Sequence, residues 1–76
     1  MNINRDTKIL EAILFASGNP VLEDDLKEKM INKKNFKKEM EDLKLFYENR
    51  GINLIKTGNK WSFRTSETIK DELTIF

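Results

Sequence analysis

The stretch of sequence that decides the fold is Ile52-Asn53-Leu54-Ile55-Lys56-Thr57-Gly58-Asn59-Lys60-Trp61-Ser62-Phe63-Arg64-Thr65. Large apolar side chains recur at every second residue in both of its halves, at Ile52 and Leu54 and again at Trp61 and Phe63. This is the period of half-buried strands. Gly58-Asn59 separates the two halves, and glycine tolerates the positive φ that tight hairpin turns require. The stretch therefore predicts a β-hairpin.

Three segments with helical spacing precede the hairpin. The first helix is expected from about residue 5 to 17, with an apolar face formed by Ile9, Leu10, Ile13, Leu14 and Ala16. The second is short and is expected from about residue 22 to 30, where Leu26 and Met30 supply the buried contacts. The third has a core-facing stripe at spacing i, i+4, i+7, i+11, made of Phe36, Met40, Leu43 and Tyr47.

Residues that start and stop helices separate these segments. Gly18 or Asn19 is expected to adopt the left-handed geometry that ends the first helix, and Pro20 prevents the helix from continuing. Asp6 and the cluster Glu23-Asp24-Asp25 complement the positive ends of the first and second helices. Either Asn32 or Asn35 is expected to cap the third helix. Ser66 is expected to cap a last helix that carries Ile69 and Leu73.

Helix, helix, helix and hairpin is the element order of a winged helix-turn-helix. We therefore expect an α+β fold with three helices, a two-stranded β-hairpin wing and the start of a further helix, in a single domain over residues 1–76. Its apolar end, Ile75-Phe76, suggests a piece of a longer protein. Some winged helices read DNA and others bind protein partners, so the fold alone leaves the function open.

The composition excludes several classes of site. The 76 residues include no Cys and no His, which rules out disulfides, zinc and haem sites that need those ligands, and triads that use them. Glu23, Asp24 and Asp25 have no second acidic cluster beside them, and no glycine-rich phosphate loop occurs. We therefore expect no enzyme and no cofactor. A net charge of +1 gives no global attraction to nucleic acid or membrane, and no apolar run suggests a signal peptide or membrane span.

A lysine cluster at the start of the third helix is the feature that favours DNA binding. The candidate DNA contacts are Lys33, Lys34, Lys37 and Lys38, joined by Lys60 and Arg64 of the hairpin. The same helix continues with Glu39, Glu41, Asp42 and Glu48, which would repel phosphate along its length. We expect Trp61 in the core instead of stacked on bases. Nucleic-acid contact is therefore expected to be weak or indirect.

Three large apolar side chains fall outside the stripes that the core requires, which suggests a surface for a partner. Phe15 points away from the apolar face of the first helix, Leu45 lies nearly opposite the stripe of the third, and Phe46 lies on its flank. Lys37 and Lys44 are candidate charged residues at the rim of such a surface. The alternative is that the wing or the last helix covers these side chains.

Parts of the chain resemble a known family. The run Ile9-Leu10-Glu11-Ala12-Ile13-Leu14-Phe15-Ala16-Ser17-Gly18-Asn19-Pro20-Val21 is similar to the opening helix of the bacterial segregation and condensation protein B (ScpB) family. Residues 47–55 and 58–65 resemble two later segments of that family, in the same order, and the three matches cover about half of the chain. Residues 27–35 depart from the family pattern because they are rich in Lys and Asn.

The resemblance implies a function that composition and spacing do not give. It implies the first of two winged-helix domains in a non-enzymatic subunit of the bacterial condensin-like SMC–kleisin complex, in the cytoplasm and associated with the nucleoid. It also implies a homodimer that binds the kleisin subunit (ScpA-like) and, through it, the SMC ATPase. No membrane contact is expected. The alternative is a winged-helix DNA-binding transcriptional regulator.

Overall fold

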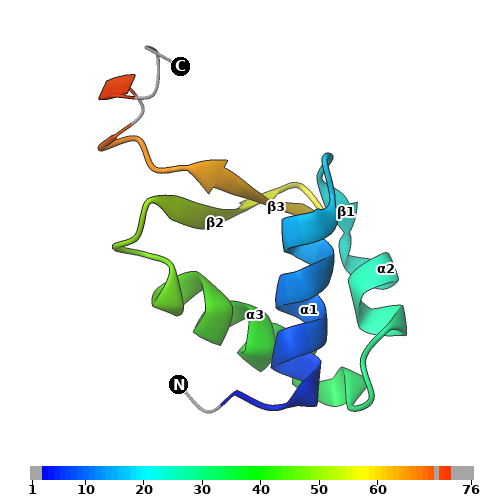
Figure 1. Ribbon diagram of the computed structural model, residues 1–76. Coiled ribbons are helices and arrows are strands. Elements are labelled where there is room, and N and C mark those ends of the chain that lie inside the picture. The colour runs from blue at the N-terminus through cyan, green and yellow to red at the C-terminus, as the bar shows by residue number, and fades with distance from the viewer. Residues whose placement is uncertain (1–2, 70, 73–76) are drawn as a thin grey trace.

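The structure is a computed structural model that describes residues 3–69 and 71–72. The elements follow in the order α1 (Arg5–Ala16), β1 (Val21–Leu22), α2 (Glu23–Glu28), a short 3-10 helix η1 (Lys33–Asn35), α3 (Phe36–Phe46), β2 (Ile52–Thr57) and β3 (Lys60–Thr65). In Figure 1 the sheet lies over one end of the helices, and α1 packs against both α3 and β3. The α+β class and the three main helices are therefore confirmed, in an arrangement consistent with a winged helix.

The hairpin predicted from the sequence is present. β2 and β3 pair antiparallel from Ile52 opposite Thr65 to Thr57 opposite Lys60. Gly58 has a φ of 62° in the turn, and it is the only described residue with positive φ. Because L side chains rarely adopt that conformation, glycine is the residue that this turn requires.

A third strand, which the sequence did not predict, widens the sheet. Val21 pairs with Trp61 and Leu22 pairs with Lys60, so the strand order is β1-β3-β2. The backbone N–H of Glu23 then donates to the carbonyl oxygen of Asn59 at 2.9 Å. Strand β1 therefore joins the loop after α1 to the closed end of the hairpin and sets where α2 begins.

An apolar core lies between the helices and the sheet. Its buried members are Leu10, Leu14, Leu26, Met30, Phe36, Met40, Leu43, Leu54 and Trp61. The stripe predicted on α3 is confirmed, with Tyr47 partly buried at its end. The face predicted on α1 is wrong at Ala16, which is exposed because it lies in the last turn, beyond the contacts of Leu14.

Buried polar groups hold the N-terminal end of α1 to the rest of the domain. The Asp6 carboxylate accepts hydrogen bonds from the backbone N–H groups of Ile31 (2.7 Å) and Asn32 (2.9 Å). The Thr7 hydroxyl donates to Glu39 of α3, and Thr7 is 2% exposed while Glu39 is 4% exposed. Asp6 thus lies in the first turn as expected, but its hydrogen bonds tie α1 to the segment before η1.

The predicted helix caps are the main local errors. Gly18 and Asn19 do not have positive φ, because α1 ends at Ser17 in extended backbone. Neither Asn32 nor Asn35 makes a side-chain capping bond, because the chain enters α3 through the 3-10 turn η1. The second helix is shorter than expected and ends at Glu28.

After β3 the side chain of Ser66 accepts a backbone hydrogen bond as predicted, but the described residues that follow it do not form the α-helix that the sequence predicted. Ser66 is buried, its backbone N–H donates to the Gly51 carbonyl at 2.8 Å, and its side-chain oxygen accepts from the Thr68 N–H at 3.3 Å. Residues 67–69 form a turn. The predicted contact of Leu73 lies outside the described residues.

Candidate functional site

Three surface grooves carry the candidate side chains, and the first lies between α1 and the wing. This α1–wing groove has a volume of about 270 Å³ and is lined by Glu11, Ala12, Phe15, Tyr47, Ile52 and Phe63. Phe15 is 78% exposed at its border. The Tyr47 hydroxyl donates to Glu11, and that hydrogen bond is the first cause of a raised Tyr47 pKa. The groove is therefore mostly apolar, with one fixed polar pair.

The second groove lies between the outer side of α3 and β2. This α3–β2 groove has a volume of about 400 Å³ and is lined by Glu41, Lys44, Leu45, Glu48, Asn53, Leu54 and Ile55. Leu45 is 63% exposed and Ile55 is 37% exposed. Strand β2 is also an edge of the sheet, since β3 is its only partner among the described residues. The groove therefore offers apolar side chains beside an open strand edge.

The third groove lies between α2, α3 and the closed end of the hairpin. This lysine groove has a volume of about 360 Å³ and is lined by Glu23, Lys27, Phe36, Lys37, Met40, Glu41, Lys44, Lys56 and Trp61. Its floor consists of Phe36, Met40 and Trp61, each no more than 5% exposed. The groove thus has an apolar base and a charged border.

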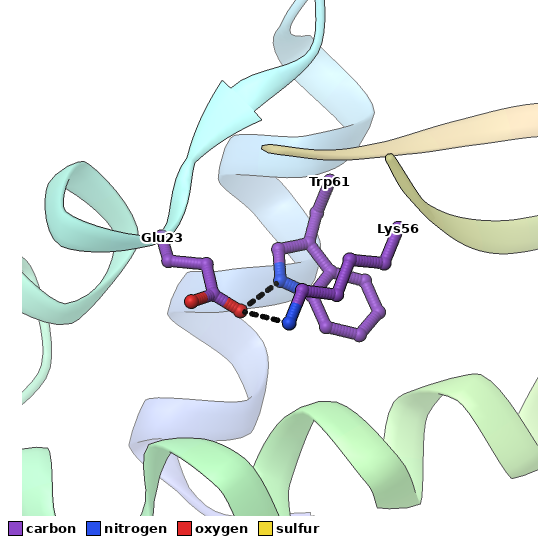
Figure 2. A network of polar contacts seen from close by, with 3 residues as sticks. All are labelled: Glu23, Lys56 and Trp61. Carbon is purple, nitrogen blue, oxygen red and sulfur yellow. Dashed lines mark hydrogen bonds and ion pairs between the residues drawn. The ribbon is translucent and has the colours of Figure 1, made fainter. Parts of the chain in front are cut away.

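A polar network fixes one wall of the lysine groove (Figure 2). Glu23 Oε1 accepts a hydrogen bond from Trp61 Nε1 at 2.9 Å and forms an ion pair with Lys56 Nζ at 3.2 Å. The Trp61 hydrogen bond, followed by the Lys56 contacts, lowers the pKa of Glu23 against the opposing effect of burial. Because the indole N–H of a buried tryptophan needs an acceptor, Glu23 allows Trp61 to pack in the core.

Comparison with models of protein families identifies the family of this chain. The family model for "Segregation and condensation complex subunit ScpB" matches residues 8–76. The chain belongs to the ScpB family. Comparison with curated protein sequences gives no match. Members of this family are subunits of the chromosome segregation and condensation complex. The match confirms the resemblance that the sequence showed.

The structure separates the side chains that the sequence singled out as a partner surface of this ScpB-family chain. Phe15 lines the α1–wing groove, Leu45 lines the α3–β2 groove, and Lys37 lines the lysine groove. Lys44 lines both the α3–β2 groove and the lysine groove. Phe46 lines none of these three; its ring packs edge-on against Tyr47 and has the Arg50 guanidinium 4.4 Å from its centroid.

The candidate DNA contacts are likewise not on one face. Lys33, Lys34, Lys37 and Lys38 are all exposed at the start of the α3 region, and the Lys33 ammonium donates to the Met30 carbonyl oxygen at 3.1 Å. Side chains alternate between the faces of a strand, and Trp61 points toward the helices. Lys60 and Arg64 flank Trp61 and Phe63 in β3, so they lie on the opposite face of the sheet.

One argument against DNA binding by this ScpB-family chain is corrected by the structure. Glu39 was expected to repel phosphate, but its carboxylate is buried and accepts from Thr7 and from Asn4 Nδ2, the latter at 3.2 Å. Glu41 is exposed on α3, Glu48 is exposed just after it, and Asp42 is half-buried. The first turn of α3 is therefore more positive than the sequence alone suggested.

Sequence reasoning missed the hydrogen-bonded walls of the grooves. The Glu23–Trp61 and Glu11–Tyr47 pairs join residues that are 38 and 36 positions apart. Only the alternation that placed Trp61 toward the helices hinted at the first pair. Within residues 3–69 and 71–72, no cluster of acidic side chains suited to a metal ion occurs, and no helix has the length and apolarity to cross a membrane.

Acid should destabilise this domain through two carboxylates. The backbone N–H groups of Ile31 and Asn32 lower the pKa of Asp6 below its ordinary 3.8, and Trp61 lowers that of Glu23 below its ordinary 4.5. Each carboxylate then contributes stability above the unfolded-state pKa, which is lost as pH falls through the lower folded-state pKa. We expect the urea midpoint to fall steeply below about pH 4.5, and Asp6→Asn with Glu23→Gln to flatten that fall. If the urea midpoint of the double variant fell with pH as steeply as that of the wild type, these two carboxylates would not be the cause of the acid sensitivity.

Proposed function

We propose that this chain acts as a non-enzymatic subunit of the bacterial condensin-like SMC–kleisin complex, as a homodimer that binds the kleisin subunit. The observation that carries the proposal is the separation of two large exposed apolar side chains into two grooves. Phe15 and Leu45 are 78% and 63% exposed and lie in the α1–wing groove and the α3–β2 groove. A single partner does not account for apolar side chains on two separate surfaces as simply as two partners do.

The α3–β2 groove supports self-association or kleisin binding in a particular way. Its apolar residues Leu45 and Ile55 lie beside β2, whose outer backbone groups have no strand partner among the described residues. An added strand or a helix laid along the groove would cover those apolar groups. The exposed charges of Lys44 and Glu48 border the groove and suit the polar rim of an interface.

The test of this proposal is the mass of the chain in solution, alone and with the central segment of the kleisin from the same genome. We expect light scattering to give a dimer that gains the mass of the kleisin segment. A monomer that ignores the kleisin would contradict the proposal. A protein with this function would lie in the cytoplasm, at the nucleoid, and its contact with DNA would be weak or indirect.

Leu45→Asp is expected to leave the domain folded and to weaken self-association or kleisin binding by roughly tenfold or more, because it places a charge in an apolar anchor. Ile3→Asp is the matched control, since Ile3 is 58% exposed and lines none of the three grooves. Circular dichroism should show both variants folded. Unchanged mass and affinity in Leu45→Asp would remove Leu45 from the interface.

A DNA-binding regulator is the second candidate, and the burial of Glu39 favours it. With that carboxylate turned inward, Lys34, Lys37 and Lys38 form an exposed positive cluster. Such binding would weaken steeply with salt. The variants Lys37→Glu and Lys38→Glu, with a DNA duplex and a peptide as ligands, distinguish the two candidates.

A further inference from the structure

The charges around the lysine groove are not balanced by the chain itself. Four lysines line it, together with two glutamates. Glu23 is engaged by Trp61 and Lys56. Within residues 3–69 and 71–72, Lys27, Lys37 and Lys44 form no ion pair. The border therefore carries an excess of positive charge that is available to a negatively charged partner.

Lysine side chains also cover the apolar floor of the groove. The Lys27 ammonium lies 5.1 Å from the centroid of the Phe36 ring, and that of Lys56 lies 5.8 Å from the Trp61 ring. Cation–π contacts of this kind are weaker than a charge-assisted hydrogen bond to a carboxylate. A carboxylate that reaches Lys27 would therefore draw this lysine away from the Phe36 ring and uncover apolar surface beneath it.

We propose that the lysine groove binds an acidic peptide segment in which a large apolar side chain lies between two carboxylates. The carboxylates pair with Lys37 and Lys44, and one of them also reaches Lys27 across the groove. The apolar side chain then covers the part of the floor that Lys27 leaves, on the side of Phe36. This deepens the proposed function, because it names the chemistry of the segment that a kleisin would present to this domain. The occupant is a protein segment, and its recognition depends on both charge and apolar contact.

The position of the lysines on α3 sets the spacing of the acidic residues. Lys37 and Lys44 are seven residues apart on one helix, which places their backbones about 10 Å apart along its axis. Carboxylates at positions i and i+7 of a partner helix match that distance and lie on one face of that helix. This gives a sequence pattern that distinguishes the expected segment from a general excess of acidic residues.

Duplex DNA fits this groove less well than an acidic peptide does. Glu41 lies between Lys37 and Lys44 on the same border, where it would face the continuous charge of a phosphate backbone but only the apolar side chain of the proposed peptide. A phosphate backbone also offers no apolar group that could contact the floor of the groove. Lys60 and Arg64 lie on the opposite face of the sheet, so they cannot join the groove lysines on one duplex.

Trp61 provides a direct probe of the groove, because it is the only tryptophan of the chain. The probe ligand is a synthetic helical peptide with Glu at positions i and i+7 and Leu between them, and its control has Gln in place of both Glu. We expect the Glu peptide to change the Trp61 emission in a saturable way and the Gln peptide to bind at least tenfold more weakly. No saturable change with the Glu peptide would overturn the proposal.

Lys37→Glu and Lys38→Glu form a matched pair of variants. The two residues are adjacent, both are exposed, and only Lys37 lines the groove. We expect Lys37→Glu to raise the Kd of the Glu peptide roughly tenfold, and Lys38→Glu to leave it within about twofold. Lys27→Gln is a second groove variant and should also weaken binding. Equal weakening by Lys37→Glu and Lys38→Glu would overturn the proposal, because it indicates diffuse attraction to the lysine cluster.

Two further binding experiments, with a DNA duplex and with a kleisin segment, identify the partner. A 20-base-pair duplex that competes with the peptide, and that loses affinity equally in both variants, would overturn the proposal in favour of a DNA surface. A kleisin central segment whose binding falls in Lys37→Glu would support it. If the kleisin binds wild type and Lys37→Glu equally, the proposed function stands and the groove assignment to the kleisin fails. If the kleisin does not bind but the Glu peptide does, the groove stands and the proposed function fails.

Discussion

Trp61→Ala is expected to lower the free energy of unfolding of the domain by about 3–5 kcal/mol. Trp61 is 5% exposed and belongs to the apolar core between the helices and the sheet. Truncating a buried tryptophan to alanine costs about 3–5 kcal/mol. A chain of 76 residues has a total stability of roughly 4–11 kcal/mol at the usual stability per residue. The substitution therefore removes a large part of that stability, which urea unfolding followed by circular dichroism would measure.

Trp61→Phe separates the contribution of the ring from that of the indole N–H. Phenylalanine keeps much of the apolar contact but cannot donate to Glu23, which then retains its ion pair with Lys56. We expect a urea midpoint between those of wild type and Trp61→Ala, and a smaller loss of stability when the pH is lowered. If Trp61→Ala cost less than about 1 kcal/mol, the core role of Trp61 would be contradicted.

The hairpin was predictable because its signals are local. Alternation within six-residue strands and a glycine between them specify the pairing without help from the rest of the chain. Gly58 has the positive φ that the turn requires. Strand β1 was not predictable, because Val21 and Leu22 are too few to show a period. Only the position of β3 beside them makes these residues a strand.

The helix ends show where local rules were overridden by contacts with distant residues. Gly18 and Asn19 have the residue types of a helix C-cap, yet α1 ends in extended backbone that leads to the pairing of β1 with β3. The Asp6 carboxylate binds backbone groups 25 and 26 residues away. No sequence pattern within a helical turn reports such a contact, so the sequence could place Asp6 in the first turn but not identify its partners.

The candidate site was predictable in part. Helical spacing alone placed Phe15 and Leu45 outside the core, and both are exposed in the structure. Which groove each side chain lines depends on where the hairpin lies across the helices, and that is a tertiary property. The lysine groove depends on the same placement, because Lys56 of β2 meets Glu23 of α2 only through the sheet. The sequence indicated Lys37 and Lys44 as rim residues and Phe36 and Met40 as core residues, but it did not bring them together with Lys56 and Trp61 in one groove.

Thr7→Val is expected to cost about 1.5–3 kcal/mol of folding free energy, the usual effect of removing a hydrogen bond to a charged group. Valine has nearly the same shape as threonine but lacks the hydroxyl that donates to Glu39. Glu39 is 4% exposed, and its carboxylate would keep only the donor Asn4 Nδ2 at 3.2 Å. Water cannot readily replace the lost donor at this depth, so the buried carboxylate is left under-satisfied.

A double-mutant cycle shows whether the Glu39 carboxylate is the cause. Thr7→Ser keeps the hydroxyl and should cost clearly less than Thr7→Val, while Thr7→Val combined with Glu39→Leu should cost less than the sum of the two single changes. Each variant would be compared by urea unfolding at pH 7. Additive costs would contradict the pairing, because the two side chains would then stabilise the domain independently. Non-additive costs would show that α1 is joined to α3 by this buried pair, which holds the two helices that carry Phe15 and Leu45 in a fixed relation.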